Sequence, residues 1–173
     1  MLRKLKRSSA RVDIHPLRNG GWDTVKQWNR IRETIESYPQ ADHFLLCVDR
    51  DGHEARKQVL GALEQSVHGI LKPPRAFFAV QAFQQIEVWA LAGIDWRLKR
   101  GWTWSRVRSE RDPKEHFFEP IASHRGLLDS VGQGRKILGE EAARNYSRVR
   151  QNCPELCELE RRITEWIAAS GAR

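Results

Sequence analysis

The stretch FLLCVDRDG, residues 44–52, decides the fold. Phe44 to Val48 form a continuous apolar run without polar alternation, which predicts a strand buried on both faces of a parallel sheet. The run leads directly into Asp49 and Asp51, which are followed by Gly52. Open α/β sheets bind their ligands beyond the carboxyl ends of the strands. The stretch therefore predicts a buried strand and, at its carboxyl end, a ligand-binding or catalytic site.

The segments on either side of this stretch complete the pattern of an α/β fold. Before it, residues 11–17 alternate like a short edge strand, and a helix is expected to begin at Asp23. After it we expect a helix over residues 54–67, a second buried strand over residues 76–80 and a helix over residues 83–92. Strands that alternate with helices predict a mostly parallel sheet flanked by helices.

From residue 96 onward the pattern changes to helices alone. The clearest are expected over residues 135–150 and 155–169, the second with one apolar stripe. We therefore expect an α/β core over residues 1–95 and a C-terminal helical region, over residues 96–173, packed on that core.

The composition restricts the classes of protein to which the chain can belong. Of its 173 residues 40% are hydrophobic and 30% charged, and 30 Lys and Arg against 22 Asp and Glu give a net charge of +8. This balance excludes a disordered polyelectrolyte. The longest apolar stretch, residues 76–93, is interrupted by polar side chains, which excludes a membrane span. Three cysteines, an odd number, favour a reducing compartment. We expect a cytoplasmic protein with a polyanionic partner.

Two acidic positions are candidates for metal chemistry. Asp49 and Asp51 both leave the strand end, so their carboxylates can face one hard cation such as Mg²⁺, while Gly52 lets the backbone turn away. Glu87 is a lone carboxylate among apolar neighbours, where a charge is costly unless it is paired or metal-bound. Alternatively, one aspartate caps a helix, the other is a surface residue, and Glu87 lies on the solvent side of an amphipathic helix. An EF-hand is excluded because Leu60 stands at the twelfth loop position.

A basic run interleaved with tryptophans is the candidate nucleic-acid surface. Residues 97–108, RLKRGWTWSRVR, contain no acidic residue. Basic side chains can follow a phosphate backbone, and aromatic rings can stack on bases. The alternative is a solvated surface with two buried tryptophans. The candidate residues are Arg97, Lys99, Arg100, Trp102, Trp104, Arg106 and Arg108.

Together these motifs resemble one known family. FLLCVDRDG, followed after a helix by FFAVQAFQQIEVWALAG (residues 77–93), is similar to the Toprim fold in its branch of uncharacterised predicted nucleases related to the overcoming-lysogenization-defect (OLD) nucleases. The later stretch GRKILGEEAARNYSRVRQNCPELCELERRI (residues 134–163) resembles the helical tail of that branch. The resemblance covers residues 12–163.

The resemblance implies a Toprim-like (Rossmann-like) sheet, dependence on Mg²⁺ or Mn²⁺, and hydrolysis of phosphodiester bonds, of DNA in preference to RNA. Asp49 and Asp51 match the metal ligands of the family's DxD motif. Glu87 matches the glutamate of its second acidic motif, with Trp89 as the aromatic residue. The resemblance also implies a role in phage defence or DNA repair with a partner ATPase of the AAA or ABC type.

The chain departs from the family pattern at three places. Gln85 stands where an acid is common, and Gly93 stands where Asp is common. Toprim chains open with a strand that ends in Glu-Gly, and we expect that strand and its catalytic glutamate to be absent here. A sheet without this strand exposes an edge or apolar side chains. We therefore expect a homo-oligomer, or a partner that supplies a strand.

The sequence leaves three functional hypotheses open. The leading one is a nuclease in which Asp49, Asp51 and Glu87 form the catalytic metal site. The second is a catalytically impaired module that binds nucleic acid or docks on an ATPase. The third, a haloacid-dehalogenase-like phosphatase, shares the apolar strand and DxDG, but the paired acids which that class needs do not follow residues 76–80.

Overall fold

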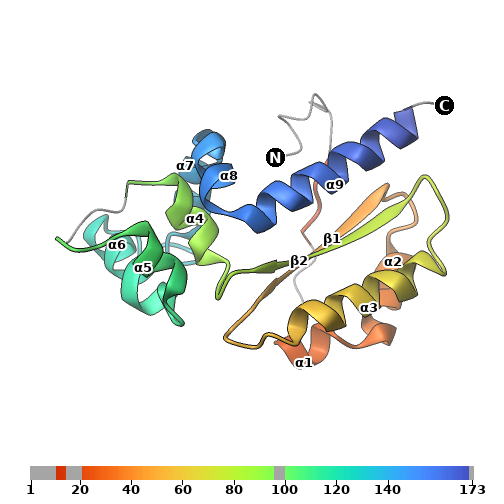
Figure 1. Ribbon diagram of the computed structural model, residues 1–173, viewed down its shortest axis with the longest axis horizontal. Coiled ribbons are helices and arrows are strands. Elements are labelled where there is room, and N and C mark those ends of the chain that lie inside the picture. Colours follow the sequence, from red (N-terminus) through yellow and green to blue (C-terminus); the bar gives the residue numbers. More distant parts are fainter. Residues whose placement is uncertain (1–10, 15–20, 96–99, 172–173) are drawn as a thin grey trace. The chain divides into compact units, whose positions relative to one another are not determined.

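The computed structural model describes residues 11–14, 21–95 and 100–171 (Figure 1). These residues form two compact units that are discontinuous in sequence. The first contains the described residues up to Leu46, residues 55–80 and those from Glu160 onward. The second contains residues 47–54 and the described part of 81–159. Of the described helices, none is long and apolar enough to cross a membrane.

A two-stranded parallel sheet packed against helices is the β-structure of the described residues. Its strands are β1 (His43–Asp49) and β2 (Ala76–Ala82), each extended beyond the predicted strand by one or two residues. β2 is mostly buried, as predicted. In β1, however, Leu45 and Cys47 are exposed, so the prediction that this strand is buried on both faces is wrong. Residues 11–14 are exposed and belong to neither helix nor strand, and residues 15–17 lie outside the described part.

The first unit contains α1 (Trp22–Val25), α2 (Trp28–Ser37), α3 (Arg56–His68), most of β2 and the last part of α9 (Pro154–Gly171). The single helix expected from Asp23 is two helices, because Gln27 has an extended backbone with ψ of 117°. The amide of Gln27 donates to the carbonyl of Asp23, which helps to satisfy the end of α1. Figure 1 shows α3 and α9 on opposite sides of the strands.

The second unit is helical around a short buried helix, α4 (Glu87–Gly93). The helix α4 contacts most of its neighbours in this unit. The other helices are α5 (Trp104–Ser109), the π-helix η2 (Lys114–Phe118), α6 (Glu119–His124), α7 (Arg135–Arg144), α8 (Tyr146–Asn152) and the start of α9. The core of this unit is formed by Val88, Leu91, Phe117, Ile121, Leu138, Val149 and Cys153.

The helix predicted over residues 135–150 is interrupted at Asn145, which separates α7 from α8. The Asn145 amide donates to the carbonyl of Gly93 at 2.9 Å, and the amide of Asn152 donates to that of Ala92 at 3.2 Å. These bonds satisfy carbonyls at the end of α4 that have no partner within the helix. The break therefore lets α7 and α8 both pack on α4.

The position of Gly93 explains why a side chain is excluded there. A Cβ atom at Gly93 would lie 2.5 Å from Ala142 Cα and 2.7 Å from Val149 Cγ2. Because one of these contacts is backbone, the neighbouring helix would have to move. Glycine stands at this position, where Asp is common in the family that the sequence resembles. The close packing of α4 against α7 and α8 requires it.

We expect Gly93→Ala to destabilise the protein by about 2–3 kcal/mol, the cost of overpacking a tight helix contact. Gly139→Ala is the matched control, because Gly139 lies within α7 with no heavy atom within 4 Å of its would-be Cβ. That change should stabilise the protein by about 0.5–1 kcal/mol through helix propensity. Urea unfolding followed by circular dichroism measures both, and equal stabilities of the two variants would contradict the packing argument.

Candidate functional site

The turn that follows β1 is clamped to the turn that follows β2. Gln84 accepts hydrogen bonds from the backbone N–H groups of Arg50 and Asp51 on its carbonyl, at 2.8 and 3.0 Å. Its side-chain Oε1 accepts a third bond, from the N–H of Gly52 at 3.0 Å. One glutamine therefore fixes three successive residues at the carboxyl end of β1. All of these residues belong to the second unit.

Two residues of this clamp have left-handed backbones, although neither is glycine. The φ angles are +45° at Asp51 and +67° at Gln84, and Gly52 beside them has +73°. A left-handed backbone costs roughly 1–2 kcal/mol for a residue with a Cβ atom, and Asp tolerates it better than Gln. Such strained residues cluster at binding and catalytic sites, because there the strain holds a required geometry.

Asp49 ties β1 to the start of α4. Its Oδ1 accepts a hydrogen bond from the backbone N–H of Ile86 at 2.7 Å, and Ile86 immediately precedes α4. This contact resembles the capping alternative considered for one aspartate. It uses one carboxylate oxygen, and a carboxylate has further lone pairs that can bind a ligand at the same time.

Glu87 is buried, with 5% of its surface exposed. Its Oε1 accepts a hydrogen bond from Nε of Arg135 and forms an ion pair with Nη2 of the same residue, both at 2.7 Å. The alternative that Glu87 lies on the solvent side of α4 is therefore wrong. The guanidinium of Arg135, from α7, supplies the positive charge that burial of this carboxylate requires. Nothing in the sequence marked Arg135, which lies 48 residues away.

The described residues contain no group of three or more His, Cys, Asp or Glu side chains that could hold a metal ion. Asp49, Asp51 and Glu87 are therefore not gathered into a three-ligand cluster. Two carboxylates are still a suitable donor set for Mg²⁺, which commonly binds through one or two carboxylates and completes its shell with water and substrate phosphates. The chemistry of the donors therefore fits Mg²⁺ or Mn²⁺ at Asp49 and Asp51.

Two arginines belong to the surroundings of the turn that follows β1. Arg111 Nε lies 3.8 Å from the position that a Cβ would take on Gly52, and Arg111 is exposed. Arg50 forms an ion pair with Glu54 and lies 4.6 Å from the centre of the Phe83 ring. The sequence analysis missed Arg111, because a single arginine between Glu110 and Asp112 carries no signal of its own.

The residues predicted to bind nucleic acid differ in how exposed they are in the structure. Arg97 and Lys99 lie outside the described residues, and Arg100 and Arg106 are exposed. Trp102 is half-buried and packs edge-on against Phe117, with ring centres 4.8 Å apart. Trp104, also half-buried, begins α5.

Arg108 belongs instead to a network centred on Glu155. Its guanidinium makes two hydrogen bonds to the Glu155 carboxylate, at 2.7 and 2.5 Å. The indole N–H of Trp89 donates to the same carboxylate at 2.9 Å. The ring of Phe83 lies 4.5 Å from the Arg108 guanidinium and 4.6 Å from that of Arg50. In this arrangement the charge of Arg108 is directed inward.

Comparison with protein-family models, curated proteins and solved structures finds no match for this chain.

Glu155 should make the stability of the protein depend on pH. Burial acts to raise the pKa of this carboxyl, but the hydrogen bonds from Arg108 and Trp89 outweigh burial and hold the pKa below its ordinary value. A lowered pKa contributes stability above the unfolded value of about 4.3, and this contribution is lost as the pH falls through the folded pKa.

Glu155→Gln should therefore reduce stability by about 2–4 kcal/mol at pH 7, because Arg108 loses its charged partner. The variant should also lose less further stability than the wild type on acidification. Denaturant unfolding at a series of pH values measures both effects. Glu36→Gln, an exposed carboxylate paired with Arg32, is the control and should change little. Parallel acid profiles for wild type and Glu155→Gln would show that Glu155 is not the titrating group.

Proposed function

We propose that this chain is a Toprim-like domain that hydrolyses phosphodiester bonds of nucleic acid, in preference DNA, with Mg²⁺ or Mn²⁺ held by Asp49 and Asp51. The observation that carries the proposal is the strained turn at the end of β1, a parallel strand. Gln84 holds the backbone at Asp51, and the N–H of Ile86 holds the carboxylate of Asp49. The carboxyl end of a parallel strand is where α/β sheets bind ligands. We also propose that the chain associates with further copies of itself and acts together with a partner ATPase.

The chain's own residues would act on the phosphate as follows. A metal ion bound at Asp49 and Asp51 would supply an activated water and neutralise charge on the phosphate. Arg111, exposed beside Gly52, would bind a phosphate oxygen, because guanidinium groups match phosphate geometry. Glu87, paired with Arg135, would act as a positioning residue that holds α4 and so the backbone N–H that Asp49 accepts.

A second function is favoured by one observation. Glu87 already has a counter-charge in Arg135, and the described residues offer no third ligand beside the two aspartates. A module that binds nucleic acid, or docks on an ATPase, without cutting would have the same fold and basic charge. The two functions differ in whether the bound metal leads to strand scission.

The first test removes one metal ligand without disturbing the turn. Asp51→Asn is suitable because Asn adopts left-handed backbones readily. Mn²⁺ should raise the melting temperature of the wild type, because it binds the folded state, and should support nicking of supercoiled plasmid. The variant should lose both effects. Asp129→Asn, an exposed aspartate in a loop of the same unit, should keep both.

The outcomes separate the two functions. Nicking that requires Mn²⁺ and Asp51 supports hydrolysis. Plasmid binding without nicking, in the presence of a metal-dependent shift in melting temperature, supports the binding module. An equal melting shift in wild type and Asp51→Asn would show that the aspartates are not ligands and would remove the basis of the proposal.

The second test concerns the basic residues. If Arg100, Arg106 and Arg111 neutralise phosphates, the binding constant for double-stranded DNA should fall with about 0.9 power of salt concentration for each contact. Replacing all three by Gln should flatten the logarithmic slope by about 2–3. Fluorescence anisotropy at several salt concentrations measures the slope. Arg144→Gln, an exposed arginine on α7, is the single-charge control. A slope that the triple variant leaves unchanged would exclude these residues from the interface.

A further inference from the structure

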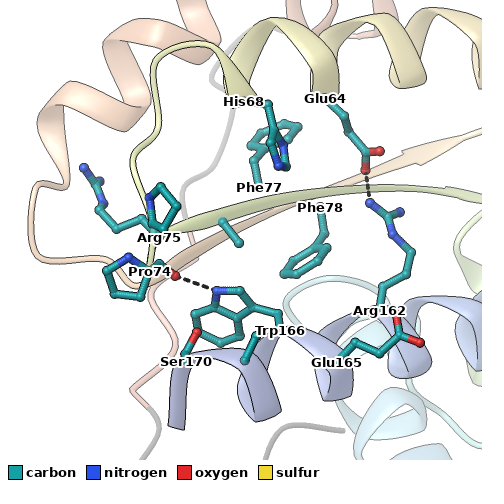
Figure 2. Close-up of a pocket in the computed structure, with 13 residues that line it drawn as sticks. Glu64, His68, Pro74, Arg75, Phe77, Phe78, Arg162, Glu165, Trp166 and Ser170 are labelled. Carbon is teal, nitrogen blue, oxygen red and sulfur yellow. Dashed lines mark hydrogen bonds and ion pairs between the residues drawn. The ribbon is translucent and has the colours of Figure 1, made fainter. Parts of the chain in front are cut away.

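A cavity of about 480 Å³ lies within the first unit, at the edge of β2 that faces away from β1 (Figure 2). Its walls come from α3, from residues 73–78 and from α9. This volume lies in the range of small-molecule sites, which are largely apolar with a few polar groups that fix orientation. Neither Asp49 nor Asp51 lines it, so its role is separate from the proposed function.

The backbone of β2 supplies one wall with hydrogen-bonding groups. The N–H of Ala76 donates to the backbone carbonyl of Asp42, on the side of β1, at 3.0 Å. Because backbone groups alternate along a strand, those of Phe77 and Ala79 face the opposite edge. At Ala79 this edge is closed by side chains: its N–H donates to Glu64 at 2.6 Å and its carbonyl accepts from Arg162 at 3.4 Å.

The cavity ends at this ion pair. Arg162 Nη2 lies 2.7 Å from Glu64 Oε1, so the pair occupies the place that a neighbouring strand would take at Ala79. The next residue on the same edge, Phe77, lines the cavity. Its N–H and carbonyl form an adjacent donor and acceptor at the cavity wall.

Aromatic rings bound the cavity above and below this edge. Figure 2 shows His68, from α3, on one side of the strand and Trp166, from α9, on the other. The indole is held in place by a hydrogen bond from Nε1 to the carbonyl of Pro74, at 2.5 Å, and by the ring of His43 at 5.1 Å. The Phe78 ring lies edge-on to Trp166, with ring centres 6.4 Å apart. The cavity therefore has aromatic side chains on both sides of the strand edge.

The charged side chains around the cavity have hydrogen-bond or ion-pair partners within the protein. The guanidinium of Arg162 is engaged by Glu64, and Arg75 donates to the carbonyls of Ala41 and Tyr38 at 3.0 and 3.1 Å. Glu165 forms an ion pair with Arg161. The aromatic walls and the backbone edge at Phe77 suit a ligand that has a ring and carries polar atoms at one edge.

We propose that this cavity binds a nucleobase. A base is a flat heteroaromatic ring that stacks on aromatic side chains, and its edge carries adjacent donors and acceptors that match the backbone groups of Phe77. The same chemistry is offered by a free nucleoside or nucleotide and by an unpaired base of a single-stranded nucleic acid. The experiment below distinguishes these two sources.

The test uses the full chain and a pair of variants on α9. Ala169 lines the cavity and is exposed, so Ala169→Trp should fill the space without removing a contact of the fold. Ala168, its neighbour, is exposed and does not line the cavity, so Ala168→Trp is the matched control. Both variants should unfold at the wild-type temperature.

The ligands are adenosine, guanosine, cytidine and uridine, their 5′-monophosphates, and single-stranded oligonucleotides with and without abasic positions. Binding is measured by calorimetry in EDTA, so that the metal site of the proposed function plays no part. Wild type and Ala168→Trp should bind at least one base-containing ligand, and Ala169→Trp should bind it about tenfold more weakly or less, a loss within the range for one stacked base. His68→Ala should weaken the same ligand about fivefold or more, because one stacking surface is removed.

Each result decides the proposal. Binding of nucleosides identifies a free-ligand site, and binding of oligonucleotides alone, lost at abasic positions, identifies an unpaired base; both support a nucleobase. No binding, or binding that Ala169→Trp leaves unchanged, overturns it. A short extended peptide that binds wild type and not Ala169→Trp, where no base-containing ligand does, would show instead that β2 accepts an added strand.

Discussion

A half-buried carboxylate, Glu155, is the charge that joins the helices of the second unit. It begins α9, and it holds Arg108 from α5 and Trp89 from α4. Its charge is compensated by the two hydrogen bonds from one guanidinium, the geometry in which a buried ion pair is most favourable. Since α4 in turn supplies the N–H that Asp49 accepts, the position of the aspartate at the end of β1 depends on this network. The turn that follows β1 is thus supported by helices far from it in sequence.

The elements that the sequence predicted correctly are those with a strong local pattern. Continuous apolar runs marked β1 and β2, and a single apolar stripe marked α9. The breaks at Gln27 and Asn145 were missed, because both depend on hydrogen bonds made by one amide side chain rather than on proline or glycine. Local periodicity does not contain that information, since the alternative of an unbroken helix has the same pattern of apolar residues.

Some residues of the candidate site could likewise be placed from the sequence, and others could not. Asp49 and Asp51 could be placed from sequence, because a strand end in an α/β sheet is defined by the apolar run before it. The burial of Glu87 and its partner could not be predicted from sequence, because the charge that compensates its burial comes from Arg135 on α7. A lone carboxylate among apolar residues indicates that a positive charge must be near, yet it does not say whether that charge is a metal ion or an arginine. Only the packing of α4 against α7 decides between them.

The turn that follows β1 combines a strained backbone with hydrogen bonds that hold it. Two left-handed residues, Asp51 and Gln84, lie on the two sides of the clamp. The strain at Asp51 and Gln84, roughly 1–2 kcal/mol for each residue, is offset by the three N–H groups that Gln84 accepts, each contributing about 1 kcal/mol. The clamp is therefore close to balanced in free energy and adds little to the stability of the fold. What it does fix is the direction of the backbone at Arg50, Asp51 and Gly52, the three residues that follow Asp49. Strained backbone that is held in this way is typical of sites where a fixed geometry is needed.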